Sequence, residues 1–323
     1  MNTHKETMPP TPAPVLISVY DRWQHLEACI EALKKNPEAK ETTLYMVSDG
    51  WQHEGHRESI EKVRAYILSI SGFKEVRTRF RESNWGMRAS AMDAFEWVFS
   101  EHDRLIRMED DIICSPVYLQ FMNEALDTYD ADHRIFCICA HTHPKFQPPR
   151  NYPHEVYLWQ TFSPWGFAMW KSRWMEFISN TESELEHLKD RSVWRKFQKV
   201  RPRMATQKMY LQGKIHNDGR LNLHIFLNAQ YSVFPTRNLT VNAGMDGSGT
   251  NCGLGWTYPQ QILTDIPIRI APDIQPSKKI NRNLYRIHFS VVNHFIGNAL
   301  HTIGLFDPLY RCYQKILCLK KPR

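Results

Sequence analysis

Residues 107–113 read Arg-Met-Glu-Asp-Asp-Ile-Ile and place three consecutive carboxylates between two short apolar stretches. Adjacent acids at the end of a core strand repel one another and lose hydration when they are buried. The arrangement makes sense if a divalent cation and a diphosphate lie on the acids, because Mg²⁺ and Mn²⁺ prefer carboxylate oxygens and share them with substrate phosphates. Taken alone, the same residues fit a solvated acidic turn equally well.

Alternating strands and helices surround these acids in the sequence. Apolar runs predict the strands, and apolar residues at helical spacing predict the helices. Strands are expected at 14–19, 43–47, 76–79, 104–108 and 135–140, and helices at 23–35, 58–70, 88–99, 117–129 and 221–229. Short connections between such elements predict an α/β domain with a mostly parallel, doubly wound sheet.

Polar clusters follow three of the predicted strands. They are Asp21-Arg22, Ser48-Asp49-Gly50 and Glu109-Asp110-Asp111. Ligands of open parallel sheets bind beyond the carboxyl ends of the strands, where these clusters would meet. The sequence therefore favours a binding site over a solvated turn.

Composition narrows the classes of partner. The 323 residues carry a net charge of +7, which favours anionic partners such as phosphates. Nucleic acid is not expected, because no DNA- or RNA-reading motif accompanies the basic residues. Neither Gly-x-Gly-x-x-Gly nor Gly-Lys-Ser/Thr follows the first strand, which disfavours dinucleotide-binding and P-loop folds. The seven cysteines lie mostly in apolar contexts, and residues 1–14 carry no apolar signal core, so a soluble, cytoplasmic protein is expected.

Several motifs further along the chain stand in a recognisable order. Ser115-Pro116 opens a helix, residues 165–170 read Trp-Gly-Phe-Ala-Met-Trp, Asn217-Asp218 precedes Pro235, and residues 242–252 read Asn-Ala-Gly-Met-Asp-Gly-Ser-Gly-Thr-Asn-Cys. With the strand-end clusters, they resemble GT-A-fold glycosyltransferases, above all the eukaryotic N-acetylglucosaminyltransferase I type and related bacterial enzymes. Asn217 and Asn251 depart from the pattern, which has Trp and His there, and Asn251 leaves open how metal or phosphate is bound.

The resemblance implies one large GT-A (Rossmann-like) domain with a mostly parallel sheet and flanking helices. We place it at residues 14–265, between a flexible leader at 1–13 and an extension at 266–323 with a basic amphipathic end. The implied activity is a metal-dependent, inverting glycosyltransferase of the hexosyl- or N-acetylhexosaminyltransferase class, in polysaccharide biosynthesis. Its cofactor would be Mn²⁺ or Mg²⁺, its donor a nucleotide sugar, and its acceptor a hydroxyl of a glycan or lipid-linked sugar.

The same resemblance assigns roles to individual residues. Asp111 is the expected metal ligand, and Asp218 is the expected base that takes the proton from the acceptor hydroxyl. The residues expected to contact the donor are Arg22, Asp49, Arg88, Glu109, Asp110, Trp165 and Gly166. Among these, Asp49 would bind the base of the nucleotide and Arg22 a phosphate. Trp170 is expected to shape the sugar pocket with Trp165, because aromatic faces pack on pyranose rings.

Each role has a plainer alternative. Asp49 and Asp218 lie in sequences that favour turns. Arg22 could pair with its neighbour Asp21, and Arg88 could belong to an ordinary helix start. Core packing would also explain the aromatic residues of the 165–170 block, Trp170 in particular.

Two other functions fit parts of the sequence. A nucleotidyltransferase also uses acidic metal sites, but it normally has a Gly-rich, basic loop after the first strand, and residues 19–22 are not one. A catalytically silent glycan-binding protein could keep the same fold. The basic, partly apolar segment 310–323 could make peripheral contact with an anionic membrane, or could dock on the core as a surface helix.

Overall fold

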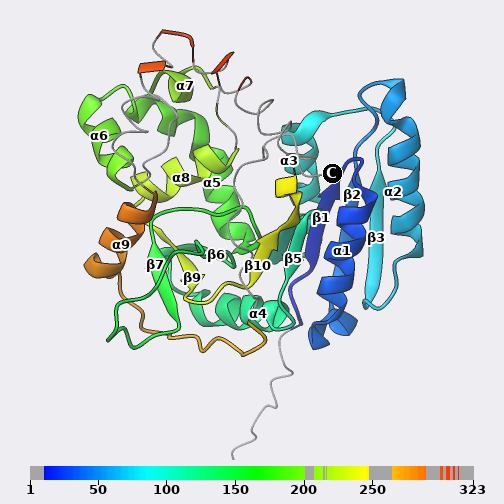
Figure 1. Ribbon diagram of the computed structural model, residues 1–323, viewed down its shortest axis with the longest axis horizontal. Coiled ribbons are helices and arrows are strands. Elements are labelled where there is room, and N and C mark those ends of the chain that lie inside the picture. Colours follow the sequence, from blue (N-terminus) through cyan, green and yellow to red (C-terminus); the bar gives the residue numbers. More distant parts are fainter. Residues whose placement is uncertain are drawn as a thin grey trace, which may run out of the picture.

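The computed structural model describes residues 11–200, 207–213, 215, 217–246, 264–288, 299–300, 303–305, 308–309 and 312. Its main sheet has eight strands in the order β3-β2-β1-β4-β8-β6-β9-β7 (Figure 1). In that order they span Glu75–Phe80, Thr43–Ser48, Val15–Val19, Arg104–Glu109, Phe167–Trp170, Ile135–Cys139, Tyr231–Pro235 and Val156–Trp159. In this sheet β8 and β7 run antiparallel to the other six strands. The predicted α/β domain with a mostly parallel sheet is therefore confirmed.

Helices cover both faces of the sheet. α1 (Trp23–Lys34), α2 (Arg57–Ser69) and α4 (Tyr118–Tyr129) pack on one face. The helices on the other face are α3 (Gly86–Glu101), α5 (Lys171–His187), α8 (Asn217–Leu227) and α9 (Lys278–His288). α6 (Arg191–Val200) and α7 (Gln207–Leu211) pack with α5 and α8 around a third apolar cluster. Short 3₁₀ turns span Pro37–Glu41, Glu54–His56 and Ala243–Asp246.

The first strand shows why the chain forms two apolar layers. Val15 and Ile17 are buried in one cluster and Leu16 in the other. Successive side chains of a strand point to opposite faces, so a strand covered on both faces reads as a continuous apolar run. This is the pattern that allowed the strand to be predicted.

A small antiparallel ribbon lies beside the end of β4. It consists of β5 (Ile112–Cys114) and β10 (Thr240–Asn242), which pair with Asn242 opposite Ile112. Because β5 begins immediately after the acids, the ribbon brings residues 240–244 next to residues 109–111. Sequence positions more than 130 residues apart thereby reach one site.

The element boundaries differ from expectation in a few places. β4 includes Glu109, so the first acid still belongs to the strand. α8 begins at Asn217, four residues before the predicted helix start. No described helix is long and apolar enough to cross a membrane. Segment 310–323, for which membrane contact and docking on the core were both considered, lies outside the described residues apart from Cys312.

We predict that Gly50→Ala strongly destabilises the fold. A Cβ at Gly50 would lie 2.3 Å from the carbonyl carbon of Ser83 and 2.6 Å from its oxygen, and both are backbone atoms that cannot rotate away. The loops after β2 and β3 would have to separate, which would strain the bond from the Gly50 amide to the Ser83 carbonyl. We expect a loss of about 3 kcal/mol in the free energy of unfolding, measured in urea.

Gly55→Ala is the matched control for this substitution. The nearest atoms to a Cβ at Gly55 belong to the His53 ring, 3.2 Å and 3.4 Å away, and that ring can move. Equal losses in the two variants would show that the close approach of the two loops does not contribute to stability.

Candidate functional site

Arg22 links the loop before α1 to the acids at the end of β4. Its Nη2 lies 2.6 Å from Asp110 Oδ1 and 2.9 Å from Asp111 Oδ2. Both acids are buried, with 6% of each residue exposed. The ion pairs of Arg22 therefore join two of the predicted strand-end clusters, in place of the alternative pairing with Asp21.

Two polar atoms of this cluster have no hydrogen-bond partner among the described residues. They are Asp111 Oδ1, an acceptor, and Arg22 Nη1, a donor, and both are buried. A buried polar atom without a partner costs about 1–3 kcal/mol, and most such atoms in proteins are satisfied. One side of the cluster can thus receive a cation and the other an anion.

Because residue 244 is glycine, the ribbon backbone can lie directly against the Asp111 carboxylate and the Arg22 guanidinium. A Cβ at Gly244 would lie 2.2 Å from Asp111 Oδ2 and 2.8 Å from Arg22 Nη1. The backbone is held there by hydrogen bonds from the Ala243 amide to the Asp111 carbonyl and from the Gly244 amide to Asn242 Oδ1, each 2.8 Å long. Any larger side chain would push the ribbon away from Asp111 and Arg22.

The cluster carries more negative than positive charge. Burial, followed by the charge on Asp111, raises the pKa of Glu109 to about 7, and Asp218 contributes to this rise. Burial also raises the pKa of Asp110 to about 6, although Arg22 opposes the shift. Both shifts indicate that burial disfavours the charged forms of these carboxylates, and a bound cation would favour them.

The donor set fits a magnesium or manganese ion that is shared with a substrate. Among the described residues, no three His, Cys, Asp or Glu side chains come together as a complete metal site. Mg²⁺ usually takes one or two carboxylates and completes its shell with water and substrate phosphates. Asp111 Oδ1 would supply a carboxylate oxygen of this kind, and Arg22 Nη1 could donate a hydrogen bond to a phosphate oxygen.

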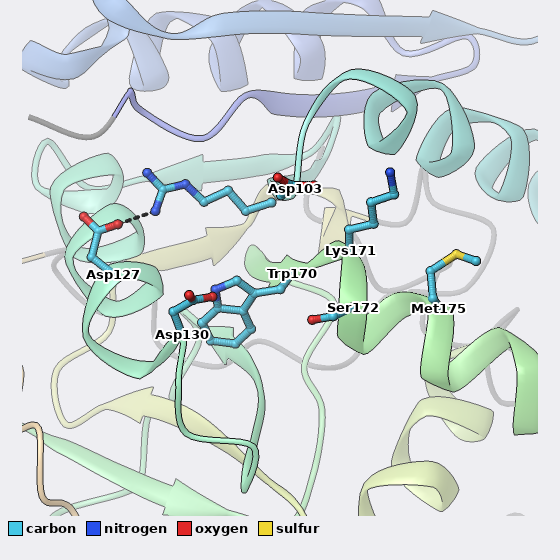
Figure 2. Close-up of a pocket in the computed structure, with 8 residues that line it drawn as sticks. Asp103, Asp127, Asp130, Trp170, Lys171, Ser172 and Met175 are labelled. Atoms are coloured by element: carbon cyan, nitrogen blue, oxygen red, sulfur yellow. Dashed lines mark hydrogen bonds and ion pairs between the residues drawn. The ribbon is translucent and has the colours of Figure 1, made fainter. Parts of the chain in front are cut away.

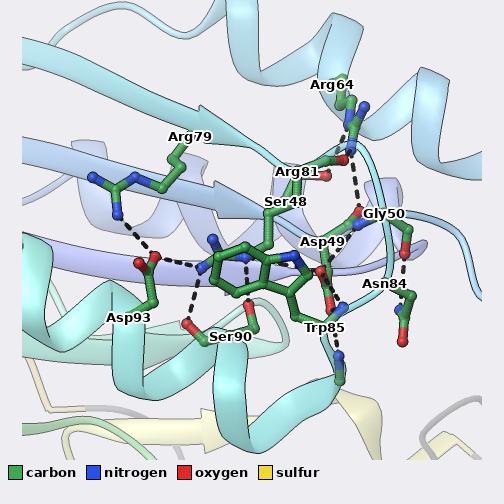
Figure 3. Close-up of polar contacts among 11 residues, drawn as sticks. Ser48, Asp49, Gly50, Arg64, Arg79, Arg81, Asn84, Trp85, Ser90 and Asp93 are labelled. Carbon is green, nitrogen blue, oxygen red and sulfur yellow. Dashed lines mark hydrogen bonds and ion pairs between the residues drawn. The ribbon is translucent and has the colours of Figure 1, made fainter.

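Asp49 anchors the start of α3 (Figure 3). Its carboxylate accepts hydrogen bonds from the backbone amides of Gly50, Trp85 and Gly86, at 3.0–3.2 Å. Next to it, the Arg81 guanidinium carbon lies 4.2 Å from the centroid of the half-exposed Trp85 ring. Because its oxygens already have these partners, Asp49 holds the loop that precedes α3. Its contact with a nucleotide base stays a prediction.

Arg88 and Gly166 have evident structural contacts. Arg88 is exposed and lies 3.6 Å from Glu182 of α5. Gly166 has a φ of +84°, and a Cβ there would lie 3.1 Å from the Tyr118 hydroxyl. The left-handed backbone explains why glycine occupies this position. Donor contacts of Arg88 and Gly166 stay predictions.

The aromatic block is divided between the two ends of β8. Trp165 precedes the strand, its carbonyl accepts a 2.7 Å hydrogen bond from Thr240 of the ribbon, and its ring packs edge-on against His141. Trp170 pairs instead with Arg104, at the start of β4 and away from the acids. The expectation that Trp170 shapes the sugar pocket with Trp165 is wrong, because an antiparallel strand carries its last residue to the opposite edge of the sheet.

We predict that His141 makes the fold sensitive to acid. Burial lowers the pKa of His141 to about 4, and the ring lies 3.2 Å from the Thr240 carbonyl. The unfolded state, with a pKa near 6.5, takes up a proton first as the pH falls, so stability is lost between about pH 6.5 and pH 4. The shift corresponds to a loss of about 3 kcal/mol, measurable as urea unfolding against pH.

His141→Gln should flatten this pH dependence, whereas replacement of the exposed His133 by Gln should leave it unchanged. An equally steep decline in the His141 variant would assign the effect to other groups, such as His143, whose pKa burial also lowers to about 4.

Sequence reasoning named the acids and Arg22 but did not single out Gly244. The only signal available was the glycine-rich string 242–252, which quoted Gly244 without a role for it. Only the pairing of β10 with β5 shows that this glycine lies against Asp111. Residues 247–252 of that string, including Asn251, lie outside the described residues.

Comparison with known proteins gives one family match. Residues 15–183, just over half of the chain, match the model described as Glycosyl transferase family 2. No curated protein matches the chain at a significant level.

Several solved structures are similar in part. "Mannosyltransferase PcManGT from Pyrobaculum calidifontis in complex with GDP-Man and Mn2+" is 11% identical with a TM-score of 0.36, over 51% of this chain and 46% of that one. S. aureus TarS is 12% identical with a TM-score of 0.41, over 71% and 36%. A UDP-glucose pyrophosphorylase complexed with UDP-glucose is 8% identical with a TM-score of 0.39, over 72% and 94%. The chain thus spans less than half the length of the first two, and none of these similarities bears on its activity.

Proposed function

Because the chain belongs to glycosyl transferase family 2 and is therefore a glycosyltransferase, we propose that it moves a sugar from a nucleotide-sugar donor with the help of Mn²⁺ or Mg²⁺. The proposed transfer inverts the anomeric centre, and the acceptor is a hydroxyl of a glycan or lipid-linked sugar. From the motif order, we propose a hexosyl or N-acetylhexosaminyl donor.

One observation carries the metal-dependent part of this proposal. Asp111 Oδ1 and Arg22 Nη1 are both buried and both lack partners among the described residues, and their side chains are joined by a 2.9 Å ion pair. A metal ion bound to the donor diphosphate presents a cation and anionic oxygens together. Such a pair would satisfy both atoms at once, whereas a cation or an anion alone would satisfy one.

The roles of the site residues follow from this arrangement. Asp111 would hold the metal, and Arg22 would donate to a diphosphate oxygen as the leaving group gains charge. When bound, the metal ion would neutralise that charge. Glu109 and Asp110 would orient metal-bound water or donor hydroxyls. Asp218 is the proposed base for the acceptor hydroxyl. Its charge adds slightly to the rise in the pKa of Glu109, which burial mainly causes.

The test is a screen for hydrolysis of nucleotide sugars without an acceptor. UDP-, GDP- and dTDP-sugars are incubated with the full chain and Mn²⁺, Mg²⁺ or EDTA, and release of the nucleoside diphosphate is measured. We expect release from at least one donor, with the metal required. Formation of a nucleoside triphosphate and a sugar 1-phosphate when pyrophosphate is added would instead identify a nucleotidyltransferase. Failure to bind or turn over any donor would favour a glycan-binding protein.

We predict that Arg22→Ala weakens binding of the matching nucleoside diphosphate in the presence of Mn²⁺ by roughly tenfold to a hundredfold. A hydrogen bond to a charged group contributes about 1.5–3 kcal/mol, and the substitution removes both the donor and its charge. Arg57→Ala is the control, because Arg57 is exposed and pairs only locally with Glu54 and Glu61. Binding by titration calorimetry that is equal in the two variants would contradict a phosphate contact of Arg22.

A further inference from the structure

A pocket lies at the edge of the sheet opposite the acids. Its volume is about 810 Å³, and its lining includes Asp103, Asp130, Trp170, Lys171 and Ser172 (Figure 2). Trp170 pairs with Arg104, the first residue of β4, whereas the acids begin at Glu109, the last. Five residue steps along a strand separate the two sites by roughly 17 Å.

Trp170 gives this pocket a buried donor without a partner. Only 4% of the residue is exposed, and its indole Nε1 has no hydrogen-bond partner among the described residues. Figure 2 shows that nitrogen turned toward Asp130, which also lines the pocket. Indole can only donate, and a buried Trp usually finds an acceptor.

The Arg173 guanidinium packs against the Trp170 indole ring. The Arg173 guanidinium lies 5.5 Å from the Trp170 ring centroid and donates to the carbonyls of Ile135 and Asp130, each at 3.2 Å. Because Trp170 is also buried, its ring has little room to rotate toward another acceptor. The indole N–H group without a partner is therefore part of the pocket wall.

The charges around the pocket discriminate between classes of ligand. Three aspartates and two basic residues line it, which gives a formal charge of −1, and Asp127 is paired with Arg104. The remaining acids, Asp103 and Asp130, disfavour an anion.

A neutral hydroxylated ligand fits this lining best. Each hydroxyl group can accept a hydrogen bond from Trp170 or Lys171 and donate one to Asp130 or Asp103. Met175, with 52% of the residue exposed, adds an apolar surface to the wall. A volume of about 810 Å³ lies within the range of ligand pockets, roughly 300–1,000 Å³.

We propose that this pocket binds a neutral sugar unit of a glycan, as a second carbohydrate site separate from the acid cluster. The proposal does not depend on the transfer reaction, because it rests on residues at the other edge of the sheet. Binding there would hold a glycan on the protein without taking part in its chemistry.

The test follows the indole N–H signals of protein labelled with ¹⁵N-tryptophan. The Trp170 signal is assigned by its loss in Trp170→Phe. Glucose, galactose, N-acetylglucosamine, cellobiose and maltose are then each titrated to 50 mM, which nearly saturates a site whose dissociation constant is about 5 mM. We expect at least one sugar to shift the Trp170 signal to saturation. A nucleoside diphosphate with Mn²⁺ should leave that signal unchanged.

Substitutions assign the effect to the pocket. Asp130→Asn and Asp103→Asn should each weaken the interaction by about tenfold, because each removes a charged acceptor. Asp190→Asn, at an exposed aspartate between α5 and α6, should bind like the native protein. The thermal midpoint of each variant is measured to show that it is folded. The absence of a saturable Trp170 shift with all five sugars, or equal affinities in the native protein and both pocket variants, would overturn the proposal.

Discussion

Asp111→Asn is expected to lower metal-dependent turnover of the donor about a thousandfold while leaving the protein folded. The substitution keeps the size of the side chain but removes the charge that would hold the cation. A metal ion contributes several kcal/mol to stabilising the leaving group, and each 1.36 kcal/mol corresponds to a tenfold change in rate. The measurement is the initial rate of nucleoside diphosphate release at saturating Mn²⁺.

Stability should respond differently from activity in this variant. Burial raises the pKa values of Glu109 and Asp110, and the charge on Asp111 adds to both rises, so removing that charge relieves repulsion inside a buried cluster. The lost ion pair with Arg22 is partly offset, because Arg22 keeps its contact with Asp110. We therefore expect the free energy of unfolding at pH 8 to fall by no more than about 1 kcal/mol.

Asp273→Asn serves as the control, because Asp273 is exposed and follows the predicted domain boundary. It should change neither rate nor stability. Two outcomes would count against the assigned role of Asp111. One is a rate within tenfold of the native protein, and the other is a loss of activity that merely follows a loss of folded protein.

The strand ends could be predicted from the sequence because parallel strands have a common direction. Once 14–19, 43–47 and 104–108 are identified as parallel, the residues that follow them must meet at one edge. The rule predicts that these clusters converge but not the contact of Arg22 with Asp110, whose position differs by 88 residues. Apolar runs and short connections carried all the information that this inference needed.

The part of the sheet after β6 could not be predicted in the same way. β8 was not among the predicted strands, and its antiparallel direction between β4 and β6 places Trp165, and not Trp170, on the side of the acids. Periodicity shows that a strand exists but not which way it runs. The partner of β5 is likewise set by long-range pairing, and for this reason the position of Gly244 beside Asp111 had no local signal.

Asp218 is a different case, because its placement depends on a helix that begins earlier than expected. It lies in the first turn of α8, and its backbone carbonyl accepts a hydrogen bond from the Asn222 side chain. Its charge also contributes to the raised pKa of Glu109, which places the two carboxylates in one electrostatic environment. A base for the acceptor has to lie near the donor, and this coupling is consistent with that requirement.

Asp218→Asn is therefore expected to reduce transfer to an acceptor by about 10²–10⁴-fold, because general-base catalysis contributes a factor of this size. Binding of the nucleoside diphosphate with Mn²⁺, measured by titration calorimetry, should change by less than about twofold, since we propose that the diphosphate binds to Asp111 and Arg22. Asp218→Glu keeps a carboxylate and should retain more transfer than the Asn variant. A carboxylate in the first turn of a helix contributes only about 0.3–1 kcal/mol, so both variants should remain folded. If the Asn variant still transferred within tenfold of the native rate, or lost diphosphate binding in parallel with transfer, Asp218 would act in binding or folding and another group would have to remove the proton.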